Sequence, residues 1–174
     1  MGKHWQTSQL GDIAQINSHT YSIKECWDFV NYLDTGNITE GQIDEIQLID
    51  QDAKLPSRAR RKVLSGDIVY STVRPNQRHF GIIKEPMTNM LVSTGFAVIR
   101  GIEGICHTQY LYYYLTQQSV VDHLHIIAEG SVSAYPSIRP SVIEGLEVNL
   151  PPLEDQKAIA SILGALDDKI ELNR

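Results

Sequence analysis

The densest cluster of side chains that could read a nucleic acid lies at residues 71–79, where the sequence is Ser-Thr-Val-Arg-Pro-Asn-Gln-Arg-His. Arginine matches the two acceptors on the major-groove edge of guanine, and Asn and Gln match the donor–acceptor pair of adenine. The alternative is a polar hairpin tip without a ligand. We expect base contacts from Arg74, Asn76, Gln77 and Arg78, and phosphate contacts from the hydroxyls of Ser71 and Thr72.

A second polar segment covers residues 130–141 and combines hydroxyl groups, one aromatic ring and one arginine. Loops of this composition lie on the surface and often carry binding contacts. The alternative is an irregular connection held by its two prolines. As second choices for base contacts we select Ser133, Tyr135 and Arg139.

A basic run, Arg-Ala-Arg-Arg-Lys, occupies residues 58–62. Its side chains fan around the axis if the run is helical and alternate between faces if it is extended. In either case several could reach phosphates, a contribution that is independent of sequence and sensitive to salt. A solvated loop is the alternative. The candidate phosphate contacts here are Arg58, Arg60, Arg61 and Lys62.

Charge is unevenly distributed along the chain. The formal net charge is −6, which argues against a nucleic-acid binder if the chain is treated as uniform. Residues 54–84 instead carry eight Lys or Arg and one acid, a net +7, so the remainder carries −13. Residues 25–52 hold eight acids and no Lys or Arg. This asymmetry predicts a cationic face on an acidic body, or else pairing between the two windows.

Length and composition restrict the class of protein. The 174 residues suit one domain, and 42% of them are hydrophobic, enough for an ordinary core. No apolar run reaches the length of a membrane span, and the N-terminus lacks the apolar stretch of a secretory signal. Two cysteines, Cys26 and Cys106, do not make a disulfide scaffold. We therefore expect a reduced, cytoplasmic protein with no membrane partner.

Sequence motifs for catalysis or cofactor binding are missing. There is no glycine-rich phosphate loop, and no pair among the six histidines and two cysteines has the spacing of a metal site. Asp167 and Asp168 have no second acidic site placed by the sequence, so we interpret them as an exposed helix face. The run at 112–114 could stack on single strands, although such a tyrosine run more often packs one ring into a helix interface.

Short apolar runs between turn residues predict strands in the first two thirds of the chain. Residues 5–16 fit an entry strand or short helix with a turn at 10–12. The Ser-Gly-Asp turn at 65–67 leads into a β-branched run that predicts a buried strand over 68–73. Other expected strands lie at the start of 32–38, at 80–84 as the returning arm of a hairpin, at 91–93 and at 95–100.

Helical spacing begins near Thr108, a residue type that can cap a helix, and predicts one helix over 109–125. Residues 142–150 fit a helical turn and then a strand. A final helix begins at 151–152 and carries an apolar stripe. The sequence ends within this pattern, which indicates that Arg174 is not the natural end and that a partner helix covers the stripe. The stripe consists of Ile159, Ile162, Leu163, Leu166 and Ile170.

Residues 150–174, LPPLEDQKAIASILGALDDKIELNR, closely resemble the conserved-region signature of type I restriction–modification specificity subunits. Three further matches occur in the expected order. They are residues 10–13 after Trp5, the 65–71 segment Ser-Gly-Asp-Ile-Val-Tyr-Ser, and the 110–115 segment that leads to Gly130 and Ser131. Together the matches cover nearly the whole chain, and the C-terminal motif is the most specific of them.

The resemblance implies a division of labour between subunits. Specificity subunits carry two target recognition domains, each followed by a long conserved helix, and the two helices form an antiparallel spacer. Each domain reads one half of a split DNA site. The specificity subunit is not an enzyme; it positions methyltransferase subunits, which use S-adenosylmethionine, and restriction subunits, which use ATP and Mg²⁺. Recognition loops differ within the family, so the base contacts named above rest on chemistry alone.

We therefore expect an α+β fold with a mixed, largely antiparallel β-sheet, packed helices and a long C-terminal helix. Residues 1–150 would form the recognition domain for double-stranded DNA, and 151–174 would begin the spacer helix. That helix would pair with a second recognition domain or with a second copy of the chain. No cofactor or metal is expected on this chain.

Two other functions are left open. The first is an assembly module that binds a methyltransferase subunit through the terminal helix without reading DNA, against which the charge asymmetry argues weakly. The second is a small nuclease or methyltransferase, against which the missing cofactor and metal motifs argue.

Overall fold

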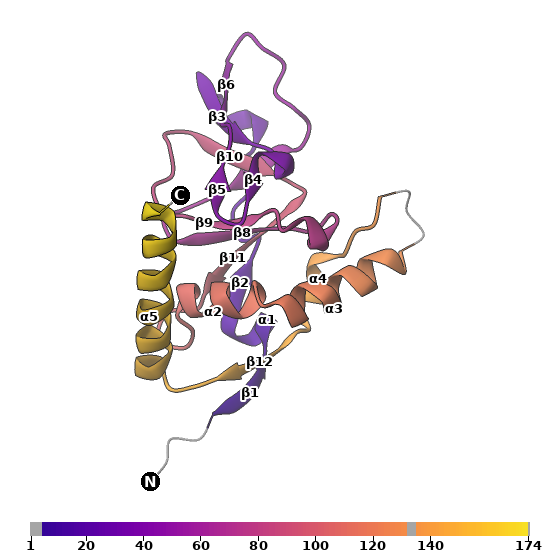
Figure 1. Ribbon diagram of the computed structural model, residues 1–174. Coiled ribbons are helices and arrows are strands. Elements are labelled where there is room, and N and C mark those ends of the chain that lie inside the picture. Colours follow the sequence, from indigo (N-terminus) through magenta and orange to yellow (C-terminus); the bar gives the residue numbers. More distant parts are fainter. Residues whose placement is uncertain (1–4, 132–134, 174) are drawn as a thin grey trace.

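Helices pack on one of two four-stranded sheets, and one long helix runs along the side of the molecule (Figure 1). The computed structural model describes residues 5–131 and 135–173. This arrangement confirms the α+β class, the mixed and largely antiparallel sheet structure, and the long C-terminal helix.

The first sheet is antiparallel throughout and contains the hairpin expected after the Ser-Gly-Asp turn. Gly66 has a φ of +86°, a backbone conformation that a residue without a Cβ adopts at little cost. Residues 67–71 are all buried, and the strand ends at Ser71 rather than at Val73. The strands, in spatial order, are β2 (Ala14–Ile16), β11 (Phe96–Gly101), β8 (Asp67–Ser71) and β9 (Phe80–Ile83).

The second sheet is mixed, because β10 runs parallel to β3 while the other pairs are antiparallel. Its order is β6 (Gln47–Asp50), β3 (Phe29–Leu33), β10 (Met90–Ser93) and β7 (Ala59–Lys62). Two short antiparallel pairs complete the strands: β4 (Ile38–Thr39) with β5 (Gln42–Ile43), and β1 (Gln6–Gln9) with β12 (Glu147–Leu150).

Apart from the short α1, the α-helices lie after residue 107 and follow the apolar periodicity of that part of the chain, and short 3₁₀ turns lie in the loops. The α-helices are α1 (Leu10–Ile13), α2 (Thr108–Leu115), α3 (Gln118–Glu129), α4 (Pro140–Glu144) and α5 (Leu153–Leu172). The 3₁₀ turns are η1 (Ile23–Glu25), η2 (Thr35–Asn37) and η3 (Pro75–Gln77).

The single helix expected over 109–125 is wrong: α2 and α3 are separate helices. Gln117 lies between them with an extended backbone, φ −60° and ψ 139°. The hydroxyl of Thr116 donates to the carbonyl of Tyr113, a local bond of the kind that competes with helix propagation. Thr108 is also not the cap, because His107 occupies that position.

The two sheets divide the core. Leucines and isoleucines of α1 to α4 bury against the first sheet in one cluster, which includes the fully buried Leu111, Leu124 and Ile143. A second cluster lies between the sheets around Leu33, Val92 and Phe96. Both clusters hold the hairpin of β8 and β9 rigidly, and the loop at its tip carries the predicted base contacts.

Candidate nucleic-acid interface

The tip of the β8–β9 hairpin is a single 3₁₀ turn, η3, with an arginine on each side of it. Arg74 has a φ of +46° and Arg78 a φ of +57°. Few residues other than glycine adopt this left-handed region. Strained conformations of this kind tend to occur at binding sites, where surrounding structure maintains them. Asn76 and Gln77 are exposed between the two arginines.

The structure brings the second polar loop alongside this tip. The amide of Arg74 donates to the carbonyl of Pro136, and the amide of Ile138 donates to the carbonyl of Thr72, each at 2.8 Å. Val73 and Ser137 form an antiparallel bridge. The two segments selected from the sequence, more than fifty residues apart, therefore form one surface.

Side chains of both loops meet on this surface. The guanidinium of Arg74 lies over the ring of Tyr135, 5.6 Å from its centroid, a favourable cation–π geometry. Tyr135 is 64% exposed, and Arg139 is exposed at the N-cap position, immediately before the first residue of α4. Ser133, which we also selected, lies outside the described residues.

Arg58 extends the surface from the other side. The carbonyl of Arg58 accepts a hydrogen bond from the amide of Thr94. Gly95 follows Thr94 in the chain, and its carbonyl accepts a hydrogen bond from the amide of Thr72. These contacts connect the residue before β7, the β10–β11 turn and both loops into one continuous strip. We call it the loop strip. It consists of Arg58, Thr94–Gly95, residues 72–77 and residues 135–139. Figure 1 shows that the segment leading into α4 lies on the side of the molecule away from α5.

The cations of the loop strip face solvent. Arg58, Arg74 and Arg139 are all exposed. Within residues 5–131 and 135–173, no carboxylate lies within ion-pair distance of any of the three. Their charge is therefore available to an anionic partner.

Ser71 and Thr72 need correction as phosphate contacts. Ser71 is 2% and Thr72 8% exposed. Ser71 donates its hydroxyl to the carbonyl of Val73, and Thr72 donates its hydroxyl to the carbonyl of Gly95. Both hydroxyls shape the base of the loop and do not face solvent, so we leave them out of the phosphate set.

The remaining residues of the basic run, Arg60, Arg61 and Lys62, lie on β7 and are all partly buried. Of the helical and extended alternatives for this run, the structure shows the extended one. Arg60 donates to the carbonyl of Ala59 at 2.7 Å. Arg61 is half-buried, and this burial lowers the pKa of its guanidinium. Lys62 pairs with Glu25 at 2.5 Å and lies over the ring of Trp27; the hydrogen bond from Lys62 lowers the pKa of Glu25.

Arg78 points away from the loop strip. Its guanidinium pairs with Glu40 at 2.8 Å and also donates to the side chain of Gln118 at the start of α3. Together with Lys62–Glu25, this pair joins the basic window to the acidic window. The expected pairing between the windows is thus present for two cations, while Arg58 and Arg74 lie outside it.

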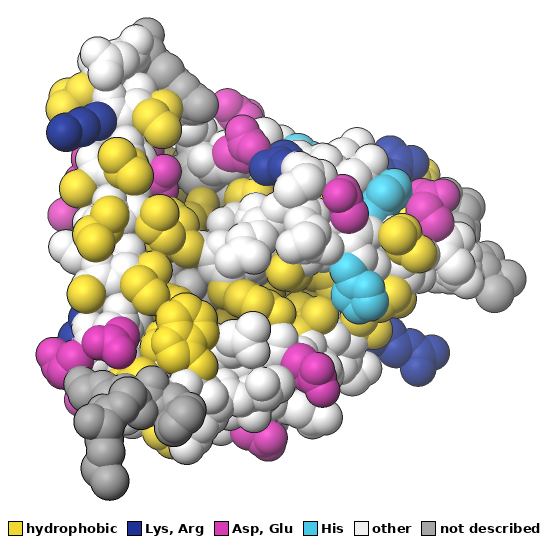
Figure 2. Space-filling view, turned by 60° about the horizontal axis from the view of Figure 1, so that its bottom comes forward, with side chains coloured by type: hydrophobic (Ala, Val, Ile, Leu, Met, Phe, Trp, Pro, Cys, Tyr) yellow, Lys and Arg dark blue, Asp and Glu magenta, His cyan; other side chains and the backbone are white. Residues whose placement is uncertain are grey.

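A second candidate surface is the apolar face of α5. Ile162, Leu166 and Ile170 are each more than half exposed. Ile159 and Leu163 are half-buried and, with tyrosines of α2, line an adjacent cavity of about 380 Å³. Figure 2 shows hydrophobic side chains in a column along α5. Large apolar side chains exposed in one row are typical of a protein interface.

Thr94 is a member of the loop strip that the sequence did not indicate. It lies exposed in the turn between β10 and β11. Its only signal is its position before Gly95, between two apolar runs. The register that places this turn beside Thr72 depends on strand pairing, which no local pattern determines.

In residues 5–131 and 135–173, no three His, Cys, Asp or Glu side chains are grouped so that they could hold a metal ion. No helix of that part is long and apolar enough to cross a membrane.

Comparison with known proteins gives the family. The sequence model of the type I restriction modification DNA specificity domain matches residues 2–174. The type I restriction enzyme HindI specificity subunit of Haemophilus influenzae is 30% identical over 169 residues, which are 97% of this chain and 36% of that protein. The MjaIX specificity subunit of Methanocaldococcus jannaschii is 26% identical over 188 residues, covering 97% of this chain and 39% of that protein.

A solved structure has the same fold. The crystal structure of the HsdS subunit from Thermoanaerobacter tengcongensis superposes with a TM-score of 0.83 at 24% identity, over 100% of this chain and 44% of that chain. The chain thus spans less than half the length of these relatives. Since the family model covers almost every residue, the chain belongs to the type I restriction–modification DNA specificity family.

Proposed function

We propose that residues 1–150 form a target recognition domain that reads one half of a split DNA site through the loop strip. The observation that carries this proposal is the convergence of two polar loops with Arg58, Arg74 and Arg139, none of which has a carboxylate partner among the described residues. Arg74, Asn76 and Gln77 would contact bases, with Tyr135 and Arg139 as neighbours. Arg78, held by Glu40 and Gln118, would maintain the loop's shape.

Residues 151–174 would begin the spacer helix. The exposed stripe on α5 supports this assignment, because an apolar row at helical spacing fits a second helix. The occupant would be the spacer helix of a second recognition domain or of a second copy of the chain. The assembled subunit would place methyltransferase and restriction subunits on the DNA and would itself catalyse no reaction.

The proposal is tested by mapping N6-methyladenine across the genome of the source cell, with the gene intact and with it deleted. The expected result is that deletion removes one split methylated motif. Exchange of residues 1–150 for those of another specificity subunit should then change only one half of that motif. If deletion changes no methylated motif, the DNA-reading function is contradicted. Co-purification with a methyltransferase subunit would then favour the assembly module.

Phosphate contacts give a second prediction, on salt dependence. Replacing Arg58 by alanine should weaken binding to all DNA sequences about equally. Each lost phosphate contact should reduce the slope of log Kobs against log salt by about 0.9. Binding of the assembled methyltransferase to its own site and to an unrelated duplex, titrated at several salt concentrations, measures both effects.

Lys62→Ala is the matched control for this experiment. It removes the same charge, but from a residue that pairs with Glu25 and lies at the far end of β7. We expect it to change the salt slope little. An equal change for Lys62→Ala and Arg58→Ala would show that the protein's net charge, rather than the loop strip, accounts for the effect.

A further inference from the structure

The face of α5 that meets the rest of the molecule is small and polar. Of its described residues, only Gln156 and Ala160 are buried. One turn further on, a Cβ added at Gly164 would lie 2.8 Å from the Nε2 of Gln109 in α2. The absence of a side chain at Gly164 therefore leaves room for the side chains of Gln109 and Tyr113, which extend from α2 toward α5. The exposed part of the apolar stripe, Ile162, Leu166 and Ile170, faces away from these buried residues.

Gln156 fixes the base of the helix by hydrogen bonds. Its side chain is 1% exposed. The Oε1 atom accepts the amide of His107 at 2.8 Å, and the Nε2 atom donates to the carbonyls of Ile105 and Pro151 at 3.1 and 2.8 Å. Both amide protons and the amide oxygen are thus used. These bonds hold α5 to the segment that precedes α2.

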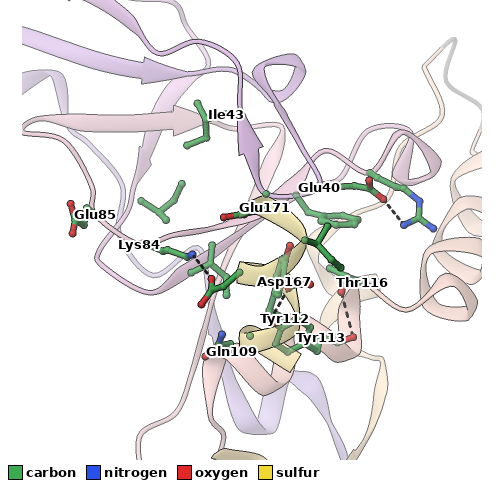
Figure 3. Close-up of a pocket in the computed structure, with 18 of the residues that line it drawn as sticks. Glu40, Ile43, Lys84, Glu85, Gln109, Tyr112, Tyr113, Thr116, Asp167 and Glu171 are labelled. Carbon is green, nitrogen blue, oxygen red and sulfur yellow. Dashed lines mark hydrogen bonds and ion pairs between the residues drawn. The ribbon is translucent and has the colours of Figure 1, made fainter. Parts of the chain in front are cut away.

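The contact ends part-way along the helix. The hydroxyl of Tyr113 donates to Asp167 at 2.8 Å, and a cleft of about 620 Å³ opens beyond it between α5 and the body of the domain. Figure 3 shows α5 on one side of this cleft and the strands on the other. Across it, Lys84 and Asp168 approach to 3.9 Å, and both are mostly exposed. The firm attachment is therefore confined to residues 153–167.

We infer that this attachment sets the spacing between the two halves of the DNA site. We call it the joint: Gln156, Ala160 and Gly164 of α5 against residues 105–113. This inference rests on the proposed function, in which α5 links the recognition domain to the second half of the subunit. The joint determines the direction in which α5 leaves the domain, and the exposed stripe determines what α5 binds.

A small change at the joint has a large effect at the far end of the helix. Twenty residues of α-helix span about 30 Å, so a tilt of about 6° at the base moves the end by about 3 Å. One base pair occupies about 3.4 Å of the duplex axis. A wedge at the joint would therefore displace the recognition domain by about one base pair relative to its partner.

The test is Gly164→Leu in the full-length protein in its source cell, with N6-methyladenine mapped genome-wide. The matched control is Ala165→Leu, which adds a larger side chain at an exposed neighbouring position. For Gly164→Leu we expect methylated motifs with both half-sites unchanged and a spacer lengthened or shortened by one base pair, or a mixture of lengths. Ala165→Leu should keep the original spacer.

Intact half-sites in the Gly164→Leu map show that the domain is folded and reads DNA. A single, unchanged spacer in that map would overturn the role of the joint while leaving the DNA-reading function intact. Gly164→Leu could remove methylation altogether. In that case the double variant Gly164→Leu/Gln109→Ala tests the inference, because the alanine makes room for the leucine. Methylation restored at the original spacing supports the joint, and continued loss overturns it. Failure of the proposed function is seen separately, in the gene deletion.

Discussion

Replacing Arg100 by methionine should lower the free energy of unfolding by about 3–5 kcal/mol, the usual cost of removing one partner from a buried ion pair. Arg100 holds the carboxylate of Asp67 with two bonds, Nε to Oδ1 at 2.6 Å and Nη2 to Oδ2 at 2.7 Å. The Asp67 side chain has no exposed surface. Without the guanidinium, the buried charge keeps one hydrogen bond among the described residues, from the amide of Leu64.

The effect should be smaller when the other partner is removed. Asp67→Ala leaves Arg100, whose side chain is 27% exposed and can turn toward water. Asp67→Ala lowers the free energy of unfolding through the loss of the ion pair and of the hydrogen bond to Leu64, but it leaves no buried charge without a partner. The Asp67 carboxylate also raises the pKa of Arg100, so the arginine is charged at every pH that a stability measurement would use.

Urea unfolding of the purified protein, followed by tryptophan fluorescence, measures both variants. The midpoint should fall most for Arg100→Met and less for Asp67→Ala, with the slope m unchanged. Arg139→Met makes the same substitution at an exposed arginine and should stay within about 0.5 kcal/mol of the parent. Equal midpoints for Arg100→Met and Arg139→Met would contradict the structural role of the buried pair.

The pair also shows how far the sequence could predict the fold. The Ser-Gly-Asp turn and the β-branched run after it predicted a buried strand, and β8 is that strand. The ion pair of Asp67 could not be predicted from the sequence. Its partner Arg100 lies 33 residues away, and the two meet only because Ile68 pairs with Ile99 across β8 and β11. Turn chemistry is local, whereas strand register is decided by the whole sheet.

In the candidate site, too, local features were predictable from the sequence and contacts between distant residues were not. Residue types alone singled out the loop at 71–79 and the segment at 130–141, and the structure joins them. What composition could not supply is which side chains are already engaged. Lys62 and Arg78 have the same chemistry as Arg58 and Arg74, but they meet Glu25 and Glu40 in the fold. Gln156 had no signal at all, because an amide on a helix is ordinarily exposed.

Replacing Arg74 by alanine should relax the recognised DNA motif at one position. The left-handed backbone of Arg74, its amide bond to Pro136 and the Tyr135 ring beneath its guanidinium together restrain the side chain. The N–H donors of a guanidinium match the two acceptors on the major-groove edge of guanine. A lost base contact of this kind costs about 1–3 kcal/mol, or roughly 5- to 140-fold in affinity for the original site.

Methylation mapping of Arg74→Ala in the source cell gives the motif directly, and the position that loses preference should be a guanine. Arg74→Lys keeps the charge but cannot form two parallel bonds, so it should relax the same position. Arg58→Ala, in contrast, should weaken methylation at every site and leave the motif unchanged. That contrast separates a base contact from a phosphate contact without a structure of the complex.

Tyr135→Leu distinguishes how Arg74 reads the base. If the ring only restrains the guanidinium, the leucine variant should relax the same position as Arg74→Ala, but to a smaller extent, because a cation–π contact at an exposed site contributes about 0.5–1 kcal/mol. If Tyr135 contacts a base itself, a different position of the half-site should change. An unaltered motif in both Arg74→Ala and Arg74→Lys would exclude Arg74 as a base contact and shift the reading to Asn76 and Gln77 on the same turn.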